Sequence, residues 1–318
     1  MQRRGFIGLV GSLLAWPLAA RAQQPRIASI GVLISSNPEP TTTMLKDALR
    51  EIGYVEGQNV HFEFRSGDGS QAVLRALAEE LVRLRVDVIV AFATPAALAA
   101  KQTTTAIPIV MARVGDPIRS ELVSNLARPE GNITGFSSMT SELATKMLEL
   151  VREILPSTKR VGVLANVADP FSLLFVEEIE ASGQAMAVAI KSISVRSSNE
   201  VEAAIATFDK QRVDAVVVQP SIAYEPTIDL MKKYHLPSLS TTSLYSQAGG
   251  LMSYAADTNE SYHRIAFFID KILKGAKPSE LPVEQPTKYE LAINLKTAKI
   301  LGLTVPSTLL VRADEVIE

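Results

Sequence analysis

Three short apolar segments of this chain occur twice, in the same order and 127 to 131 residues apart. A spacing this long excludes a solenoid, whose units recur every 20 to 50 residues or so, and it indicates a duplicated α/β half. Two such lobes would face each other with the carboxyl ends of their strands, where open α/β sheets bind ligands. The pairs are Ile30-Gly31-Val32-Leu33 with Val161-Gly162-Val163-Leu164, Val86–Val90 with Val213–Val217, and Ile107-Pro108 with Leu236-Pro237.

Short apolar runs alternate with segments of helical period along both halves, which predicts an α/β fold of two Rossmann-like lobes with mainly parallel sheets. The first series has strands at Ile27–Ile34, Asn59–Arg65, Asp87–Phe92 and Ile107–Met111, and helices at Thr41–Ile52, Ala72–Leu84 and Pro95–Lys101. The second has strands at Arg160–Ala165, Ala187–Val195, Ala215–Val218 and Pro237–Ser240, and helices at Glu142–Ile154, Pro170–Ser182, Glu200–Phe208 and Tyr224–Tyr234.

Three segments are predicted to cross between the lobes, and three crossings would form a hinge about which the lobes close on a ligand. They are Gly131–Gly135, the segment Leu251–Tyr254 after Gly249-Gly250, and the proline-rich stretch Lys277–Thr287. We therefore assign residues 23–136 together with about 255–283 to lobe 1, and about 137–254 together with 284–318 to lobe 2.

Residues 1–22 have the features of an export signal: Arg3-Arg4, an uncharged stretch from Gly5 to Ala20, and a small-x-small ending at Ala22. Arg3-Arg4-Gly5-Phe6-Ile7 also resembles a twin-arginine signal, and an ordinary Sec signal is the alternative. No other stretch is long and apolar enough to span a bilayer. The sequence therefore predicts an exported, soluble, periplasmic protein from which residues 1–22 are removed.

Composition and missing motifs argue against several functions. The formal charge is −2, and removal of residues 1–22 leaves 29 basic and 34 acidic residues, so nothing favours nucleic acid or an anionic membrane. Cysteine is absent and His61, His235 and His263 are far apart, so we expect no metal site. The chain has no Gly-x-Gly-x-x-Gly, phosphate-binding loop or Gly-x-Ser-x-Gly motif, so we expect no cofactor and no enzyme activity.

The most specific local feature is Thr94-Pro95-Ala96-Ala97, directly after a predicted strand that ends at Phe92. Thr94 is expected to cap the helix and Pro95 to occupy its first position, where no N–H is needed. The backbone N–H groups of Ala96 and Ala97 would then point out of the sheet, and a helix N-terminus favours an anion such as a carboxylate. The alternative is that Thr94-Pro95 only starts the helix.

Polar residues at the other predicted strand ends should face this site. The repeat offset applied to Thr94 leads to Ser221, within Gln219-Pro220-Ser221, and Tyr224 follows with a hydroxyl and a ring. Further candidates at strand ends are Ser35, Ser36, Asn166, Asp169, Asp116 and Thr242. Both aspartates precede proline, which is equally typical of a helix cap or a turn, so a purely structural role is the alternative for each.

Several longer phrases are also recognisable: Gly53–Val60, Val86–Ala91, Leu126–Pro129 with Gly131–Gly135, Ala248–Tyr254, Pro282–Lys288, Ile293–Lys299 and Arg312–Ile317. Together they resemble the family of ABC transporter substrate-binding proteins that includes tryptophan-binding members, over essentially all of the chain after residue 22. The resemblance implies a type I periplasmic-binding-protein fold with three hinge strands and a closing cleft. It implies cleft loops at Ser35-Ser36, Ala93-Thr94, Asp116, Ser137-Ser138, Asn166 and Gln219–Tyr224. The chain has Ala93, Glu130 and Ala255 where the family often has glycine.

The resemblance and the two-lobed pattern together predict a solute-binding protein of an ABC importer, a monomer that passes a small ligand to a permease and its ATPase. The expected ligand is an amino acid or a small carboxylate, aromatic ones included. Its carboxylate would contact Thr94 and the helix amides, its amine Asp116 or Asp169, and its apolar part Tyr224 or Phe171. An exported enzyme and a ligand sensor for a membrane receptor are the alternatives.

Overall fold

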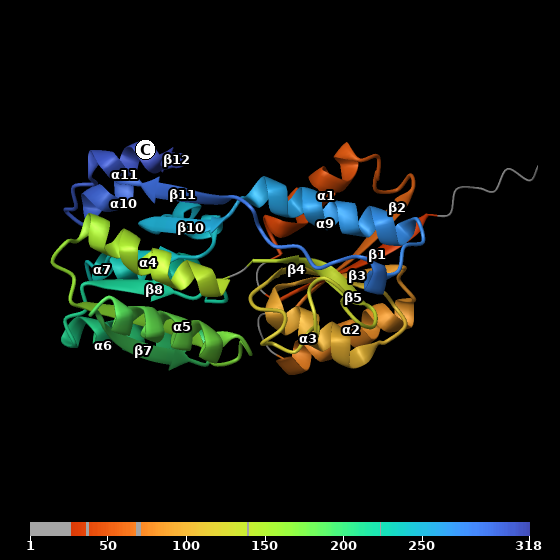
Figure 1. Ribbon diagram of the computed structural model, residues 1–318, viewed down its shortest axis with the longest axis horizontal. Helices are drawn as coiled ribbons and strands as arrows, with labels where there is room; N and C mark the ends of the chain where they lie inside the picture. The colour runs from red at the N-terminus through yellow and green to blue at the C-terminus, as the bar shows by residue number, and fades with distance from the viewer. Residues whose placement is uncertain (1–26, 36–37, 68–70, 139, 223) are drawn as a thin grey trace, which may run out of the picture.

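The chain forms two α/β lobes that lie side by side (Figure 1). The computed structural model describes residues 27–35, 38–67, 71–138, 140–222 and 224–318. Within these residues, lobe 1 has a five-stranded parallel sheet in the order β2-β1-β3-β4-β5. Its elements are β1 (Ala28–Ile34), α1 (Thr41–Glu51), β2 (Val60–Ser66), α2 (Gln71–Leu84), β3 (Val88–Phe92), α3 (Ala93–Thr103), β4 (Ile109–Val114), β5 (Ile133–Ser137), α9 (Thr258–Leu273) and the 3-10 turn η2 (Pro278–Glu280).

In the described part of lobe 2, a seven-stranded sheet has the order β12-β11-β10-β9-β8-β6-β7, parallel except between β10 and β11. The predicted fold class, two α/β lobes with mainly parallel sheets, is thereby confirmed. The elements are α4 (Thr140–Ile154), β6 (Arg160–Asn166), α5 (Ser172–Ala185), β7 (Ala189–Val195), η1 (Ser198–Glu200), α6 (Val201–Lys210), β8 (Ala215–Val218), α7 (Tyr224–Lys233), β9 (Ser238–Ser240), α8 (Ser243–Gln247), β10 (Met252–Ala256), β11 (Tyr289–Asn294), α10 (Leu295–Ile300), α11 (Ser307–Arg312) and β12 (Glu315–Ile317).

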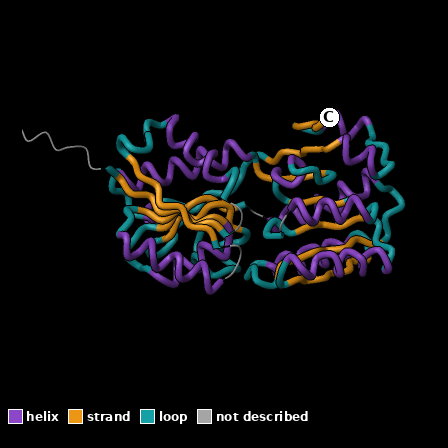
Figure 2. The backbone as a smooth tube through the Cα atoms, turned by 180° about the vertical axis from the view of Figure 1, so that it is seen from behind, coloured by secondary structure: helices purple, strands orange, loops and turns teal. Residues whose placement is uncertain are grey.

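The two sheets share one strand order, because β2-β1-β3-β4 of lobe 1 corresponds to β7-β6-β8-β9 of lobe 2. The repeated segments fall on the central strands β1 and β6 and at β3 and β8. Helices cover both faces of each sheet, so these strands are buried along most of their length and read as continuous apolar runs (Figure 2).

The repeated glycine allows a helix to pack close to the sheet. A Cβ atom on Gly31 of β1 would lie 3.1 Å from Leu81 of α2, and one on Gly162 of β6 would lie 3.0 Å from Phe208 of α6. Side chains in a close-packed interior cannot move far enough to admit that atom cheaply. The same packing requirement therefore explains glycine in both copies.

The repeated aspartate accepts hydrogen bonds from backbone N–H groups at the amino end of each sheet. The Asp87 carboxylate accepts a hydrogen bond of 2.8 Å from the backbone N–H of Ser29, and the Asp214 carboxylate accepts bonds of the same length from the N–H groups of Lys159 and Arg160. Each aspartate thus satisfies backbone donors at the start of the neighbouring central strand. The Val-Asp step recurs because both copies need it at the same place.

The chain crosses between the lobes after β5, between β10 and α9, and between Glu284 and β11. Two crossings predicted from sequence were wrong, because Gly131–Gly135 runs into edge strand β5 of lobe 1 and Leu251–Tyr254 runs into β10 of lobe 2. Gly131 and Gly249 have positive φ angles of 85° and 104° and form turns that lead into these strands. Gly131 and Gly249 each form a turn, and the chain crosses to the other lobe only after the strand that follows the turn.

The proline-rich stretch Lys277–Thr287 first follows the edge of lobe 1 before it crosses. The N–H of Ser137 donates to the Glu284 carbonyl over 2.9 Å, and the N–H of Glu284 donates to the Gly135 carbonyl over 3.0 Å. Helix α9 packs on the same lobe, with Tyr262, Ile265 and Ile269 in its core (Figure 1).

The predicted export signal, residues 1–22, lies outside the described residues. Among the helices that are described, none combines the length and the apolar character that a bilayer crossing requires.

Candidate ligand-binding site between the lobes

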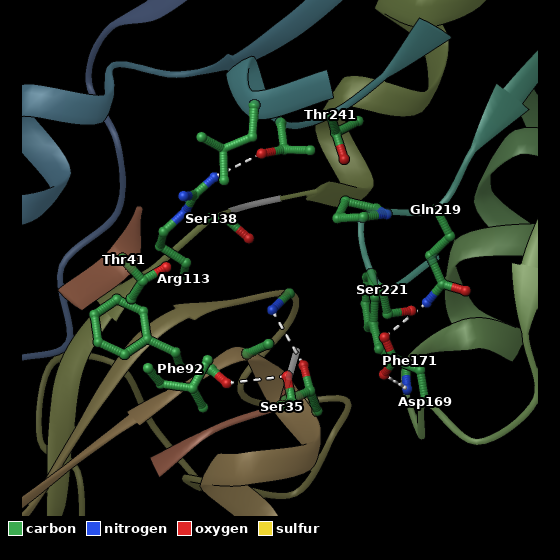
Figure 3. Close-up of a pocket in the computed structure, with 17 residues that line it drawn as sticks. Ser35, Thr41, Phe92, Arg113, Ser138, Asp169, Phe171, Gln219, Ser221 and Thr241 are labelled. Atoms are coloured by element: carbon green, nitrogen blue, oxygen red, sulfur yellow. Dashed lines mark hydrogen bonds between the residues drawn. The ribbon is translucent and has the colours of Figure 1, made fainter. Parts of the chain in front are cut away.

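A pocket lies between the lobes, at the carboxyl ends of both sheets (Figure 3). Its cavity volume is about 110 Å³. A single buried water needs about 10–15 Å³, so the pocket is large enough for a small molecule rather than for one water alone. Lobe 1 contributes Ile34, Ser35, Thr41, Phe92, Ala93, Thr94, Arg113, Gly115 and Ser138, and lobe 2 contributes Asp169, Phe171, Gln219, Pro220, Ser221, Thr241, Thr242 and Leu244.

The pocket brings together many of the residues that were chosen from sequence. Those in its lining are Ser35, Thr94, Ser138, Asp169, Gln219, Ser221 and Thr242. Ser36 lies outside the described residues, and so does the side chain of Tyr224. Pro95, Ala96, Asp116 and Asn166 do not line the pocket. Strand ends from both copies of the repeat therefore converge on one cavity.

Helix α3 begins two residues earlier than predicted, and this changes its N-terminus. The helix starts at Ala93 after Phe92, and Thr94 does not cap it; the Thr94 hydroxyl accepts a hydrogen bond of 3.3 Å from the N–H of Gly115 instead. Because only the first turn of a helix leaves its N–H groups unpaired, the amides of Ala96 and Ala97 are used inside the helix. The prediction that these amides face a ligand was wrong, and the residues at the start of this helix that line the pocket are Ala93 and Thr94.

Ala93 adopts a left-handed backbone conformation, with a φ angle of 68°. An L-residue pays roughly 1–2 kcal/mol for this conformation, which glycine adopts freely. The preference for glycine noted for the family at this position thus has a local physical reason. This chain retains the conformation with alanine, and Ala93 is part of the pocket lining.

We expect Ala93→Gly to raise the free energy of unfolding by about 0.5–1 kcal/mol, since relief of the left-handed strain exceeds the entropic cost of glycine. Ala187→Gly is a matched control, because Ala187 also has a positive φ, 55°, but is exposed and follows α5, remote from the pocket lining. Chemical denaturation measures both variants. Destabilisation by Ala93→Gly alone would contradict this account of Ala93.

Asp116 and Asn166 have structural roles next to the pocket. The Asp116 carboxylate accepts from the N–H groups of Ile118 and Arg119 over 2.9 and 3.0 Å, which is the turn role that its Asp-Pro sequence also allowed. Asn166 donates its backbone N–H to the Gln219 side-chain oxygen over 2.8 Å, and its own side-chain oxygen accepts from the N–H of Ala168.

Arg113 brings a cation into the pocket, and the sequence reasoning missed it. It lies at a bulge in β4, where the register with β5 shifts between Ala112 and Val114, and its φ angle is 54°. A bulge re-aims a side chain that regular alternation would direct elsewhere. The guanidinium crosses to lobe 2 and donates to the Thr242 hydroxyl over 3.0 Å (Figure 3). Within the described residues Arg113 makes no ion pair, so its charge is available to an anionic ligand.

Asp169 brings a carboxyl group from lobe 2. Its carboxylate accepts from the N–H of Phe171 and from the side-chain amide of Gln219, both over 2.9 Å. Gln219 is oriented by the N–H of Asn166, which fixes its amide nitrogen toward Asp169. Burial raises the pKa of the Asp169 carboxyl, and the hydrogen bond from Phe171 opposes this shift. A buried carboxylate of this kind gains from a cationic partner.

The remaining lining includes the unpaired hydroxyl of Thr241 and two aromatic rings. Thr241 is 5% exposed and its hydroxyl has no hydrogen-bond partner among the described residues; in Figure 3 its oxygen points into the cavity. An unpaired buried hydroxyl costs about 1–3 kcal/mol, which a polar ligand atom would offset. Phe92 and Phe171 stand on opposite sides of the pocket and suit an apolar ligand group (Figure 3).

The pocket therefore combines a guanidinium from one lobe, a carboxyl group from the other, and aromatic walls. Such a site matches a molecule with a carboxylate, an ammonium group and an apolar part. Over the ranges that the structure describes, no cluster of His, Asp or Glu could hold a metal ion.

Two α/β lobes that enclose a ligand-sized pocket at their hinge define a type I periplasmic binding protein, and solved structures of this class have the same fold. Residues 29–317 match the family model described as ABC transporter substrate binding protein. The chain belongs to this family, whose members are substrate-binding proteins rather than enzymes.

Three relatives illustrate the similarity. A tyrosine-binding protein of Clostridioides difficile (strain R20291) is 26% identical over 260 residues, which cover 80% of this chain and 74% of that protein. The structure of an ABC domain in complex with L-Trp from Streptococcus pneumonia is 30% identical, with a TM-score of 0.83 over 91% of this chain and 99% of that one. A conserved domain protein from Vibrio cholerae is 28% identical, with a TM-score of 0.84 over 92% of this chain and 100% of that one.

Proposed function

We propose that this protein is the solute-binding component of an ABC importer and that its ligand is an α-amino acid with an aromatic side chain. It is exported by the signal in residues 1–22, captures the amino acid between its lobes in the periplasm, and delivers it to a permease. No covalent chemistry is involved, and binding shifts the protein toward its closed state.

The observation that carries the ligand class is the guanidinium and the carboxyl group on facing lobes. Arg113 of lobe 1 has no acidic partner among the described residues, and Asp169 of lobe 2 is buried with a raised pKa. A zwitterion bridges such a pair, because its carboxylate fits the guanidinium and its ammonium group fits the carboxylate. An amino acid would thereby favour closure of both lobes around it.

The aromatic side chain is supported by the lining and by the relatives. Phe92 and Phe171 provide ring surfaces, and Thr241 provides a hydrogen-bonding group for a phenol or an indole. The relatives include one named as tyrosine-binding and one solved with L-Trp. Of the two carboxyl groups predicted from sequence to bind the ligand amine, Asp169 fits this role, since the Asp116 carboxylate is engaged in a turn.

The test is a thermal-shift screen of the protein without residues 1–22 against the twenty amino acids. A ligand at 100 times its Kd adds about 2.7 kcal/mol to the free energy of unfolding, which shifts the Tm of a chain of this size by several degrees. We expect the largest shifts from L-tryptophan, L-tyrosine or L-phenylalanine. The matched controls are indole-3-propionate, which lacks the ammonium group, and L-tryptophanamide, which lacks the carboxylate.

The outcome can contradict the proposal in two ways. Shifts as large with L-tryptophanamide as with L-tryptophan, or shifts caused only by amino acids without an aromatic ring, would exclude the ligand class. Turnover of a compound that the protein binds would exclude a pure binding function. Trp16, the one tryptophan of the chain, lies in the predicted signal, so L-tryptophan fluorescence can confirm binding without a background from the mature protein.

A further inference from the structure

One segment of lobe 1 makes several contacts with lobe 2. In this closing segment, defined as Arg113–Arg119, Arg113 donates to the Thr242 hydroxyl over 3.0 Å. Gly115 faces the ring of Phe171. Arg119 forms ion pairs with Glu177, over 3.0 Å, and with Glu178. The contacts run from inside the pocket to the surface beside it.

The contact between Gly115 and Phe171 leaves no space for a side chain at residue 115. A Cβ atom on Gly115 would lie 2.8 Å from two ring atoms of Phe171 and 2.9 Å from a third, closer than carbon atoms pack without repulsion. The φ angle of Gly115 lies outside the left-handed region, so the backbone itself would accept alanine. Absence of a side chain at residue 115 is therefore required by the opposite lobe and not by the local turn.

Phe171 is not free to move away from such a side chain. It is 5% exposed and belongs to the core cluster of lobe 2, together with Phe175 and Ile179. Its backbone N–H is held by the Asp169 carboxylate. Because close-packed interiors resist displacement of a ring, a methyl group at residue 115 would separate the lobes more readily than it would move Phe171.

The ion pairs of Arg119 are the weaker part of the closing segment. Arg119, Glu177 and Glu178 have side chains that are 40%, 61% and 32% exposed. Surface ion pairs of this kind contribute little and are screened by salt. The steric fit at Gly115 thus limits closure more strongly than the electrostatic contact beside it.

We propose that Gly115 is a positioning residue: its missing side chain sets how far the lobes close on Phe171, and through this the affinity for ligand. The effect of Gly115 on ligand affinity rests on the proposed function, whereas its effect on lobe closure does not. Phe171 connects the two, since the same ring contacts Gly115 and lines the ligand pocket.

The experiment measures closure and affinity separately in Gly115→Ala. For closure, Val73→Cys on α2 and Ala181→Cys on α5 are both exposed, and the chain has no other cysteine, so a spin-label pair reports the distance between the lobes. We expect Gly115→Ala to move the label distances to longer values. If the closed form falls to about a tenth of its population, affinity for L-tryptophan falls about 10-fold.

Two further variants make the result specific. Phe171→Leu shortens the opposing side chain, and in the double variant Gly115→Ala/Phe171→Leu we expect a recovery of the short label distances, with a coupling between the two positions in the affinities. Arg119→Ala should change affinity by less than about threefold and only at low salt. Circular dichroism checks that each variant is folded.

The inference is wrong if Gly115→Ala keeps the wild-type label distances, or if the double variant is as open as Gly115→Ala alone. Failure of the proposed function gives a different pattern: the wild type then binds no amino acid, and the label distances still decide the role of Gly115.

Discussion

Arg113→Ala is expected to weaken binding of L-tryptophan or L-tyrosine by about 3 kcal/mol, which is more than 100-fold. The reason is that Arg113 is the cation that the described lining offers to a carboxylate, and a guanidinium pairs with a carboxylate through two parallel hydrogen bonds. Isothermal titration calorimetry of the wild type and the variant measures the difference.

Arg113→Lys and L-tryptophanamide are the controls for this assignment. Lysine keeps the positive charge but cannot form the two parallel hydrogen bonds of a guanidinium, so we expect Arg113→Lys to restore only part of the affinity. The amide has no carboxylate, and its weaker binding should be nearly insensitive to Arg113→Ala. Equal loss for L-tryptophan and its amide would show that Arg113 acts on something other than the carboxylate, for example through its bond to Thr242.

Asp169→Asn is expected to weaken L-tryptophan binding by about 2 kcal/mol, about 30-fold, and to leave indole-3-propionate nearly unaffected. The carboxylate would lose its charge toward the ligand ammonium group, which indole-3-propionate lacks. The free energy of unfolding should change by less than about 1 kcal/mol at neutral pH. Asparagine avoids the cost of a buried charge, but it places its own amide group against the Gln219 amide that donates to the carboxylate in the wild type. Similar losses for both ligands would contradict the role given to Asp169.

The pH dependence has a definite sign. Burial raises the pKa of Asp169 above its ordinary value of 3.8, so the folded state holds this proton more tightly than the unfolded state. The resulting stability is present below the ordinary pKa and is lost as the pH rises through the raised one. Wild type should therefore gain stability relative to Asp169→Asn as the pH falls through that range. Over the same range wild-type affinity for an amino acid should decline, because the protonated carboxyl no longer pairs with ammonium.

Site residues could be predicted from the sequence where they come directly after the end of a strand. Asp169 and Gln219 come just after β6 and β8, and strand ends are readable from apolar runs that stop at polar residues. Arg113 lies two residues beyond the predicted strand Ile107–Met111 and gave no signal of this kind. Only the structure extends β4 to Val114 and so places this charged residue within a strand, where a buried charge requires a partner or a function.

The sequence by itself determined the two-lobed architecture. Each copy carries the local requirements of one α/β half. These are the apolar central strands, one glycine (Gly31 or Gly162) and one aspartate (Asp87 or Asp214). Packing of a helix on a strand and capping of a strand depend on neighbours within the same copy, so they leave a repeated pattern.

Only the tertiary structure decided which residues meet in the cleft. Arg113 reaches the pocket because β4 bulges against β5, and Gly115 matters because Phe171 of the other lobe stands opposite it. Both depend on strand register and on contact between the two copies. The copies differ there, and contacts between lobes carry no repeated pattern in the sequence.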